Sequence, residues 1–498
     1  MDKLDLLIVH PGAAHGIYGN ELAESLVAVE QPLWCRLIAG YVRDRGFTVK
    51  IIDAESLQVG PDEVAGYVDS ERPRLVCLAI YGHQPSASTQ QMHAGGLTAR
   101  AIKQFSDVPI IMVGGHVSAL PEQTMEEEAI DYACVGEGPV TIVGLLNRSK
   151  KSDRGAISVD PIPGLVHRGG RYTDLKINPS APLIDVDELH GNTWDLLPME
   201  RYRSHNWQAF GNLARRQPYA SIYTSLGCPY RCSFCCINAP FQSNRYRMRS
   251  PSIVVTEIEY LYHSHGVKTF KIIDEMFVLN EKHYLAICNG LAATGIADDI
   301  NIWAYARVDT VRPDTLATLR GGGIRWLALG IESASQYVRD GAQKRLKNND
   351  ILNVVRSIQA ADINVIGNYI FGLPDDNLQT MSDTLALALE LNCEFANFYS
   401  AMAYPGSPLY TEAKAKGWAL PSSWRGYSQH NDECRPLDTL HVSASNVLRF
   451  RDQAFQIYFT DPSYLNMISN KFGPETLAHV QEMTRFKLKR RLLEPVAA

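Results

Sequence analysis

The chain has 498 residues, with a hydrophobic fraction of 45% and a charged fraction of 20%, which are ordinary values for a globular protein of two or three domains. Its formal net charge of −6 gives no electrostatic reason to expect a nucleic-acid partner. No leader pattern opens the sequence and no apolar run reaches the length of a spanning helix, so we expect a cytoplasmic protein without membrane contact.

The first part of the chain alternates apolar runs with helical patterns. Strands are predicted at 4–10, 47–53, 75–80, 109–113 and 132–135, and a helix at 31–45. This alternation predicts a doubly wound parallel sheet over residues 1–146, with a ligand over the carboxyl ends of the strands. The loops there are rich in glycine, which lets the backbone approach a broad ligand closely. The candidate contacts are Pro11, Gly12, Tyr81, Gly114, Gly115, His116, Gly136 and Glu137.

Residues 147–216 have the composition of a linker. We expect a small strand pair followed by a segment that crosses between domains. Trp194 and Trp207 lie in this segment. They are predicted to pack between domains, with the lining of the gap between the domains as the alternative.

The second half repeats the strand and helix pattern. Strands are predicted at 221–226, 269–277, 301–308, 326–333, 364–374 and 394–405. Six such units are too few to close an eight-stranded barrel, so a partial (β/α)₆ barrel over residues 217–417 is predicted, with its active site at the carboxyl ends of the strands. Polar residues interrupt the apolar runs at those ends: Asp274, Glu275, Arg307, Glu332 and Ser333.

Three cysteines follow the first of these strands. Cys228, Cys232 and Cys235 have C-x₃-C-x₂-C spacing, which suits three corners of an iron–sulfur cube and leaves the fourth iron without a protein ligand. A zinc site normally needs four ligands, and no second cysteine pair is present. The alternative is a chance cluster of buried thiols or a disulfide pair. Cys236, next to Cys235, is predicted to be a packed thiol.

The motif, with Phe234 before its third cysteine, resembles the radical S-adenosylmethionine (SAM) superfamily. The resemblance implies a [4Fe-4S] cluster whose open iron is chelated by SAM, and cleavage of SAM to a 5′-deoxyadenosyl radical. It also implies roles for strand-end residues: Asp274 and Glu275 at the SAM amino group, Arg307 near its carboxylate, Glu332 and Ser333 at the ribose, and Gly372 beside the adenine. The family's usual Gly-Gly-Glu is replaced by Ile273-Asp274-Glu275, so two carboxylates are candidates for the amino group.

The first domain, placed before this motif, resembles the cobalamin-binding domain of cobalamin-dependent radical SAM enzymes. The helix start at Pro32-Leu33 and the Gly114-Gly115-His116 loop carry the resemblance. The D-x-H-x-x-G loop of the branch that ligates cobalt through histidine is missing, which implies base-off cobalamin without a histidine ligand, although His10, His15 and His116 lie on candidate loops. The alternative is a flavodoxin-like module that binds nothing or another nucleotide.

Residues 418–498 lose the strand pattern and predict a small, mainly helical domain, either a wall of the substrate pocket or a packing cap. Ser400, Tyr404, Tyr427 and His430 are candidate substrate contacts, with structural roles as the alternative.

The combined resemblance implies a methyltransferase that acts on an unactivated carbon of a small molecule through a 5′-deoxyadenosyl radical and methylcobalamin. An external electron donor of flavodoxin or ferredoxin type is expected. The main alternative is a cyclase-type reaction without methyl transfer. Methylthio transfer to tRNA is disfavoured by the acidic charge and the lack of further cluster cysteines, and a cofactor-binding sensor is disfavoured because no DNA-binding motif is present.

Overall fold

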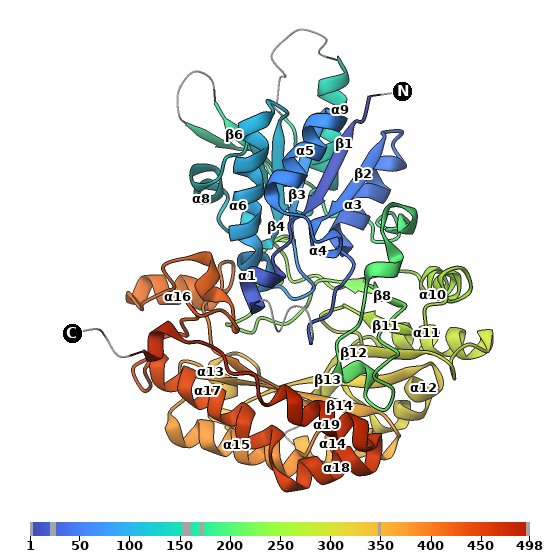
Figure 1. Cartoon of the computed structure of the whole chain (residues 1–498), viewed down its shortest axis with the longest axis vertical. Coiled ribbons are helices and arrows are strands. Elements are labelled where there is room, and N and C mark those ends of the chain that lie inside the picture. Colours follow the sequence, from blue (N-terminus) through green and yellow to red (C-terminus); the bar gives the residue numbers. More distant parts are fainter. Residues whose placement is uncertain (1–2, 20–25, 152–160, 170–173, 347–349, 495–498) are drawn as a thin grey trace.

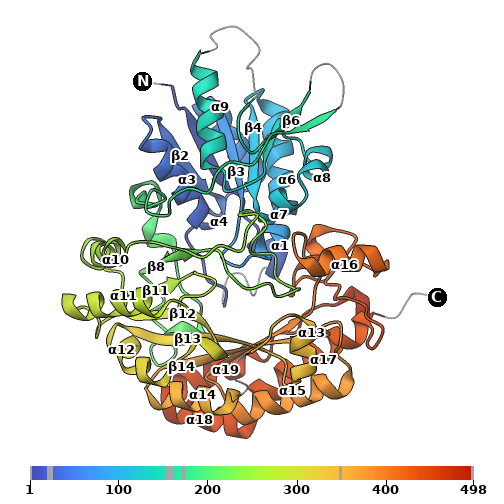
Figure 2. The same ribbon diagram turned by 180° about the vertical axis from the view of Figure 1, so that it is seen from behind.

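The computed structural model describes residues 3–19, 26–151, 161–169, 174–346 and 350–494. The described residues form two large sheets, one in each half of the molecule, and a two-stranded one; the carboxyl edges of the large sheets face a shared interface (Figures 1 and 2). No helix in the described residues is both long and apolar enough to span a membrane.

The first sheet has seven strands in the order β2-β1-β3-β4-β5-β6-β7. The first five are parallel, which confirms the predicted doubly wound sheet. The strand pair expected in the linker extends this sheet with antiparallel strands. That part of the linker therefore belongs to the first sheet. The strands are β1 Leu6–His10, β2 Val49–Asp53, β3 Leu75–Ile80, β4 Ile110–Gly114, β5 Tyr132–Cys134, β6 Leu165–Arg168 and β7 Leu175–Ile177.

Helices cover both faces of this sheet. They bury strands that are apolar on both sides. Helices α3 (Leu33–Arg43) and α9 (Pro139–Lys151) contribute to the core on one face. Helices α5 (Pro61–Glu71), α6 (Ala87–Phe105) and α8 (Pro121–Glu127) contribute to the core on the other. Short helices occupy the carboxyl edge: α1 Ala14–Tyr18, α4 Ala54–Leu57 and α7 Gly115–Ala119.

The second sheet has six parallel strands in the order β15-β14-β13-β12-β11-β8, which confirms the predicted partial barrel. These strands are β8 Tyr219–Ile222, β11 Thr269–Ile272, β12 Asn301–Arg307, β13 Ile324–Glu332, β14 Asn364–Phe371 and β15 Phe395–Ser400. The helices between and after them are α10 Pro251–His265, α11 Glu281–Thr294, α12 Leu316–Gly321, α13 Gln336–Gly341, α14 Ile351–Ala360, α15 Leu378–Leu391 and α16 Pro408–Lys416.

Glutamine side chains satisfy the two open edges of this sheet. Gln31, from the first domain, donates to the Tyr219 carbonyl (2.6 Å) and accepts from the Ser221 amide (2.9 Å) on β8. Gln429 bonds both the amide and the carbonyl of Ser400 on β15, each at 2.9 Å. A carboxamide offers the same donor and acceptor as a neighbouring strand, so both edges are paired.

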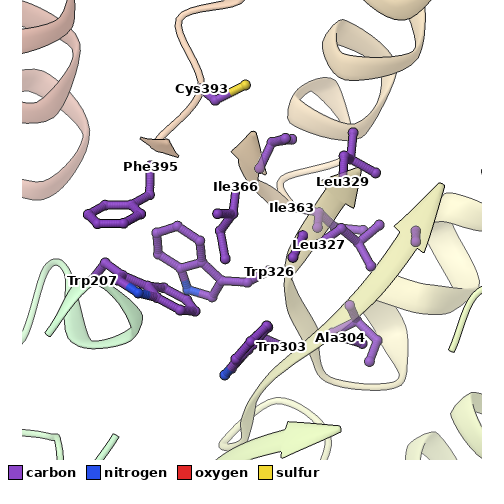
Figure 3. Close-up of a cluster of buried hydrophobic side chains, with 14 of the residues drawn as sticks. Trp207, Trp303, Ala304, Trp326, Leu327, Leu329, Ile363, Ile366, Cys393 and Phe395 are labelled. Carbon is purple, nitrogen blue, oxygen red and sulfur yellow. The ribbon is translucent and has the colours of Figure 1, made fainter. Parts of the chain in front are cut away.

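An aromatic cluster closes the amino end of the partial barrel (Figure 3). Trp207 packs against Trp303, Trp326 and Phe395, with ring centroids 5.0, 5.3 and 5.8 Å away. The prediction that Trp207 packs between domains is therefore wrong, because its ring lies in the apolar core of the barrel.

Trp194 does pack between domains, as predicted. The Arg36 guanidinium from α3 lies 3.2 Å from the centre of its ring, and its indole nitrogen donates to Glu257 on α10 (3.2 Å).

The C-terminal helix α17 (Ala444–Phe459) packs against α15, β14 and β15. Helices α18 (Pro462–Phe472) and α19 (Pro474–Met483) follow it (Figures 1 and 2) and contact Phe210 through Phe472 and His479. Val447, Tyr458, Ile468 and Val480 from these helices belong to the same apolar core as the barrel strands. The helices of the predicted segment, from Ala444 to Met483, thus share the core of the barrel.

Candidate active site

The cysteine loop is held firmly at the carboxyl edge of the second sheet. It follows the short strand β9 (Ser225–Leu226), which pairs with β10 (Arg247–Met248). The Asn238 side chain donates to the Cys228 carbonyl (3.1 Å). The backbone of Ser233 bonds that of Ala342 (3.0 Å) and that of Leu409 (2.8 Å). Contacts from several elements therefore fix the positions of the three thiols.

The thiols of this loop have the character of cluster ligands. Cys228, Cys232 and Cys235 are partly exposed and none of the ten cysteines forms a disulfide, which removes the disulfide alternative. Within the described residues, no three His, Cys, Asp or Glu side chains could hold a single metal ion. In an iron–sulfur cube each thiolate binds a different iron, so the three sulfur atoms need not converge on a single metal position.

Burial raises the pKa of Cys228 to about 11 and also raises the pKa values of Cys232 and Cys235. Iron binding must therefore displace the thiol protons. Cys236 is buried, which confirms the prediction of a packed thiol.

The two carboxylates after β11 have different surroundings. Asp274 is buried and accepts from the Thr224 amide (2.6 Å), the Thr224 hydroxyl and the Ser225 hydroxyl (2.6 Å). These bonds use both of its oxygens to hold the segment that leads into the cysteine loop. Glu275 Oε2 is buried without a hydrogen-bond partner in the described structure, and burial raises the pKa of Glu275 to about 8.

Arg307, at the end of β12, lies against the cysteine loop. Its guanidinium is 3.9 Å from the centre of the Tyr230 ring, and it pairs with Asp309 (2.9 Å) and donates to the Arg345 carbonyl (2.8 Å). Phe234 is partly buried against apolar clusters that include Leu373. The cysteine loop is thus in contact with β12 and with the turn after β14.

Glu332 ends β13 with a positive φ of 65°, beside an irregularity in the pairing of β13 with β14. Such a backbone conformation is uncommon for a residue other than glycine and re-aims the side chain. Glu332 forms a buried ion pair with Lys344, a residue that the sequence patterns did not single out. The Ser333 hydroxyl lies 3.2 Å from that of Thr384 and accepts from the Ser335 amide, so it helps to hold the start of α13.

The turn that contains Gly372 is organised by Asp376. Gly372 has φ +82°, and a β carbon there would lie 2.6 Å from Val447. Asp376 accepts from the Gly372 amide (3.0 Å), the Leu373 amide (3.2 Å) and the Thr380 hydroxyl (2.6 Å). Burial raises its pKa to about 6 from an ordinary 3.8.

Asp376 gives a pH-dependent contribution to stability. Because its folded-state pKa is raised, the protonated form favours folding at low pH, and this contribution is lost as pH rises from about 4 to 6. The loss is on the order of 2–3 kcal/mol. The amide oxygen of Asn at this position can still accept from the Gly372 and Leu373 amides, so D376N is expected to lose this part of the pH dependence, whereas D375N retains it. Urea unfolding at stepped pH checks this, and an unchanged slope in D376N would contradict it.

Three neighbouring cavities lie over the carboxyl edge of the first sheet. One is lined from both domains, by Tyr81 and Gly115 on one side and Leu226 and Glu275 on the other. A second contains Gly136 and Glu137 and shares Phe241 with the first. A third, above β1 and β3, again contains Tyr81. The Tyr81 ring stacks on Trp34 with centroids 4.6 Å apart.

Only some of the predicted loop contacts line these cavities. Tyr81, Gly115, Gly136 and Glu137 do. Gly136 has φ +128° and open space where a β carbon would stand, which suits close approach of a large ligand. The Glu137 carboxylate instead pairs with Arg247 and accepts from the Ile184 amide. Pro11, Gly12, Gly114 and His116 are absent from the linings.

His116 is buried under the C-terminal segment. Its ring meets Trp424 edge-on with centroids 4.4 Å apart, and Nδ1 lies 3.1 Å from the Thr89 hydroxyl. Burial lowers its pKa to about 3, so it is neutral. Among the loop histidines, His10 lines the third cavity, with Nδ1 2.9 Å from Asp53.

The candidate substrate contacts near the C-terminus are mostly packed. The Tyr404 hydroxyl donates to the Tyr427 carbonyl (3.2 Å), and Tyr427 and Ser400 are buried. His430 lies against Tyr18 of α1, with ring centroids 5.0 Å apart. The segment around His430 thus closes one side of the space between the domains.

A polar network that sequence reasoning missed joins the domains beside these cavities. Lys271 on β11 pairs with Glu30 (2.8 Å), and Glu30 also pairs with His83 (2.9 Å) and accepts from the Tyr219 hydroxyl (2.9 Å). Its members lie far apart in sequence and belong to no motif, so no local signal marks them. The network fixes the loop after β3 against the barrel.

A cysteine loop over the open mouth of a six-stranded partial barrel defines a radical SAM enzyme. Family models agree: the B12 binding domain matches residues 22–146, and the Radical SAM superfamily matches residues 222–388. The chain therefore combines a B12 binding domain with a Radical SAM domain, as the cobalamin-dependent radical SAM enzymes do, and the cofactors that go with these two domains are a [4Fe-4S] cluster, SAM and cobalamin.

Relatives are similar along most of the chain. It is 27% identical over 438 residues to "Uncharacterized methyltransferase PH0819" of Pyrococcus horikoshii, which covers 87% of this chain and 89% of that protein. It is 26% identical to the anaerobic magnesium-protoporphyrin IX monomethyl ester cyclase of Cereibacter sphaeroides, over 82% of this chain and 63% of the cyclase. The fold matches the radical SAM methyltransferase TsrM from Kitasatospora setae, solved with cobalamin and a [4Fe-4S] cluster, with TM-score 0.69, 17% identity and coverage of 97% and 100%.

Proposed function

We propose that the protein is a cobalamin-dependent radical SAM methyltransferase that methylates an unactivated carbon of a small biosynthetic intermediate. The observation that carries this proposal is the cavity lined from both domains, where Gly82 and Gly115 lie opposite Leu226 and Glu275. When bound, the cluster and SAM supply a 5′-deoxyadenosyl radical, and methylcobalamin supplies the methyl group.

The chain's own residues would bind, orient and exclude water. Trp34, Tyr81 and Phe241 give the shared cavity an aromatic wall, which suits a large flat cofactor. The thiols of Cys228, Cys232 and Cys235 would hold the cluster. In radical chemistry the protein contributes mainly by holding the two reactants in position and by excluding water from the site.

We assign the SAM amino group to Glu275 and a structural role to Asp274. Glu275 has an unpartnered buried oxygen, whereas both Asp274 oxygens are occupied. A buried acceptor without a partner is costly unless a ligand supplies the donor. In this assignment Arg307, Glu332, Ser333 and Gly372 surround the remaining parts of SAM.

The E275Q change is therefore expected to weaken SAM binding to the cluster-loaded protein by about 10- to 100-fold, since a charge-assisted hydrogen bond is lost. The D274N change is expected to lower the thermal midpoint and to leave SAM affinity much closer to that of the wild type. Anaerobic SAM titration and thermal melts check both. Loss of SAM binding in a stably folded D274N, with E275Q unaffected, would contradict the assignment.

A ring-forming reaction without methyl transfer is the second candidate, favoured by the similarity to the cyclase. The test uses anaerobic protein with reconstituted cluster, hydroxocobalamin, SAM, a strong reductant and pools of small metabolites, with 5′-deoxyadenosine and S-adenosylhomocysteine quantified by mass spectrometry. Methyl transfer predicts that both rise together with a substrate pool. Formation of deoxyadenosine alone, with a converted substrate, would favour the cyclase reaction. If neither product forms, the proposal is overturned. A flavodoxin or ferredoxin is the expected donor in a reducing cytoplasm.

A further inference from the structure

The concave face of the second sheet is organised in layers by its parallel register. Trp303 pairs with Trp326, which forms the buried aromatic floor with Trp207. Nearer the carboxyl end, Asn368 pairs with Asn397. Residues in register on parallel strands lie on the same face. Gly330, the partner of Asn368, follows Trp326 at an even offset along β13, so it lies on the face of Trp326. The asparagines therefore stand above the tryptophans.

The layers above the floor are partly exposed and uncharged. Tyr305, two residues after Trp303, shares its face, and Tyr399, two residues after Asn397, shares the asparagine face. All four polar side chains above the floor are partly exposed. The Tyr305 hydroxyl accepts from Gln84, which lines the cavity shared by the two domains. This face is thus joined to the cavity that the cofactors would share.

Within the described residues, the asparagine pair leaves hydrogen-bonding capacity unused. Asn397 donates to Asn368 Oδ1 (2.9 Å), and Asn368 donates to the Leu329 carbonyl (3.2 Å). Each carboxamide has two N–H donors and one carbonyl acceptor. Each side chain therefore has one N–H donor left, and the side-chain oxygen of Asn397 is a free acceptor within the described residues. These groups can bond a ligand that carries a donor and an acceptor next to each other.

The cations around this face are already paired with carboxylates. An anionic substrate group that recruited one of four nearby cations would have to compete with a carboxylate that already pairs with it. These pairs are Lys271 with Glu30, Arg307 with Asp309, Lys344 with Glu332, and Arg451 with Asp452.

We propose that this face is the substrate site and that it takes an uncharged, amide-like group: a carboxamide, a lactam or the edge of a heteroaromatic base. Asn368 and Asn397 pair with its donor and acceptor, and Tyr305 and Tyr399 flank it. The inference rests on the proposed function and narrows its substrate class, disfavouring phosphorylated and carboxylated compounds.

The test is equilibrium dialysis of the complete, cofactor-loaded protein against a bacterial metabolite extract. The extract is first divided on an anion exchanger into unretained and retained fractions, and enriched compounds are identified by mass spectrometry. The informative variant is N397D, which replaces a donor with a charge. N364D is the matched control, because Asn364 lies in register with Trp326 near the floor. Y399F is a second variant should N397D fail to fold.

The expected result is enrichment of compounds from the unretained fraction that falls about tenfold or more in N397D, less in Y399F, and not in N364D. Enrichment from the retained fraction only, enrichment from neither, or equal enrichment by N397D would overturn the proposal. Reductant is then added to the enriched compounds. If they bind as expected but yield no S-adenosylhomocysteine, the methyltransferase proposal fails while the site stands.

Discussion

Replacing Cys232 by alanine is expected to remove the iron–sulfur cluster and reduce SAM cleavage to the background level. The motif offers three thiolates from one loop as ligands, and the loop is held in place by backbone bonds to Ala342 and Leu409, so the loss of one thiolate removes one corner of the cluster site. Iron and sulfide content, the visible absorption of the cluster and the yield of 5′-deoxyadenosine after anaerobic reconstitution measure the effect.

The matched control is C236A, which removes a thiol from the same loop. Cys236 is buried and is assigned no iron, so this variant is expected to keep its iron and its cleavage activity. A C232A protein with a wild-type iron content, or a C236A protein without its cluster, would contradict the assignment of ligands.

The second large effect is expected at Glu257, the centre of a buried clamp between the domains. Its carboxylate pairs with Arg36 of α3 (2.9 Å) and with Arg249 (2.7 Å), and the side chains of both arginines are only 1% exposed. Removing it by E257A leaves two buried guanidinium groups without their counter-ion, which costs about 3–5 kcal/mol. Urea unfolding and the retention of cobalamin after gel filtration check this prediction.

Glu259 on the same helix provides the control, because it is partly exposed and forms no ion pair within the described residues. The E259A change is expected to shift the unfolding midpoint little. Equal midpoints for E257A and E259A would show that the clamp does not hold the domains together.

The strand pattern made most of the fold predictable. Strands buried on both faces are continuous apolar runs, and the predicted strand at 75–80 has the bounds of β3 Leu75–Ile80. The cysteine motif was equally readable, because its function depends on spacing within one loop. Both features are local, and local features leave a direct trace in the sequence.

The remaining features depend on long-range contacts. Nothing in the sequence indicates that Lys344 pairs with Glu332, or that Lys271 crosses to Glu30 in the other domain. The sequence does not show which of Asp274 and Glu275 is free to bind the SAM amino group. The structure is needed to see that the Thr224 amide donates to the Asp274 carboxylate. His116 was predicted as a cofactor contact from its loop, but the ring is buried against Trp424.

We propose that one chain holds a cluster and a cobalamin close together between its two domains, where one cavity is lined from both. The most direct measurement is electron paramagnetic resonance of anaerobic protein loaded with both cofactors and reduced until the cluster and the cobalt are paramagnetic. The account predicts one cluster and one cobalamin per chain, with magnetic coupling that broadens the cobalt signal relative to C232A loaded with cobalamin alone, and the cluster signal relative to wild-type protein without cobalamin. Two bound cofactors with uncoupled signals would contradict it.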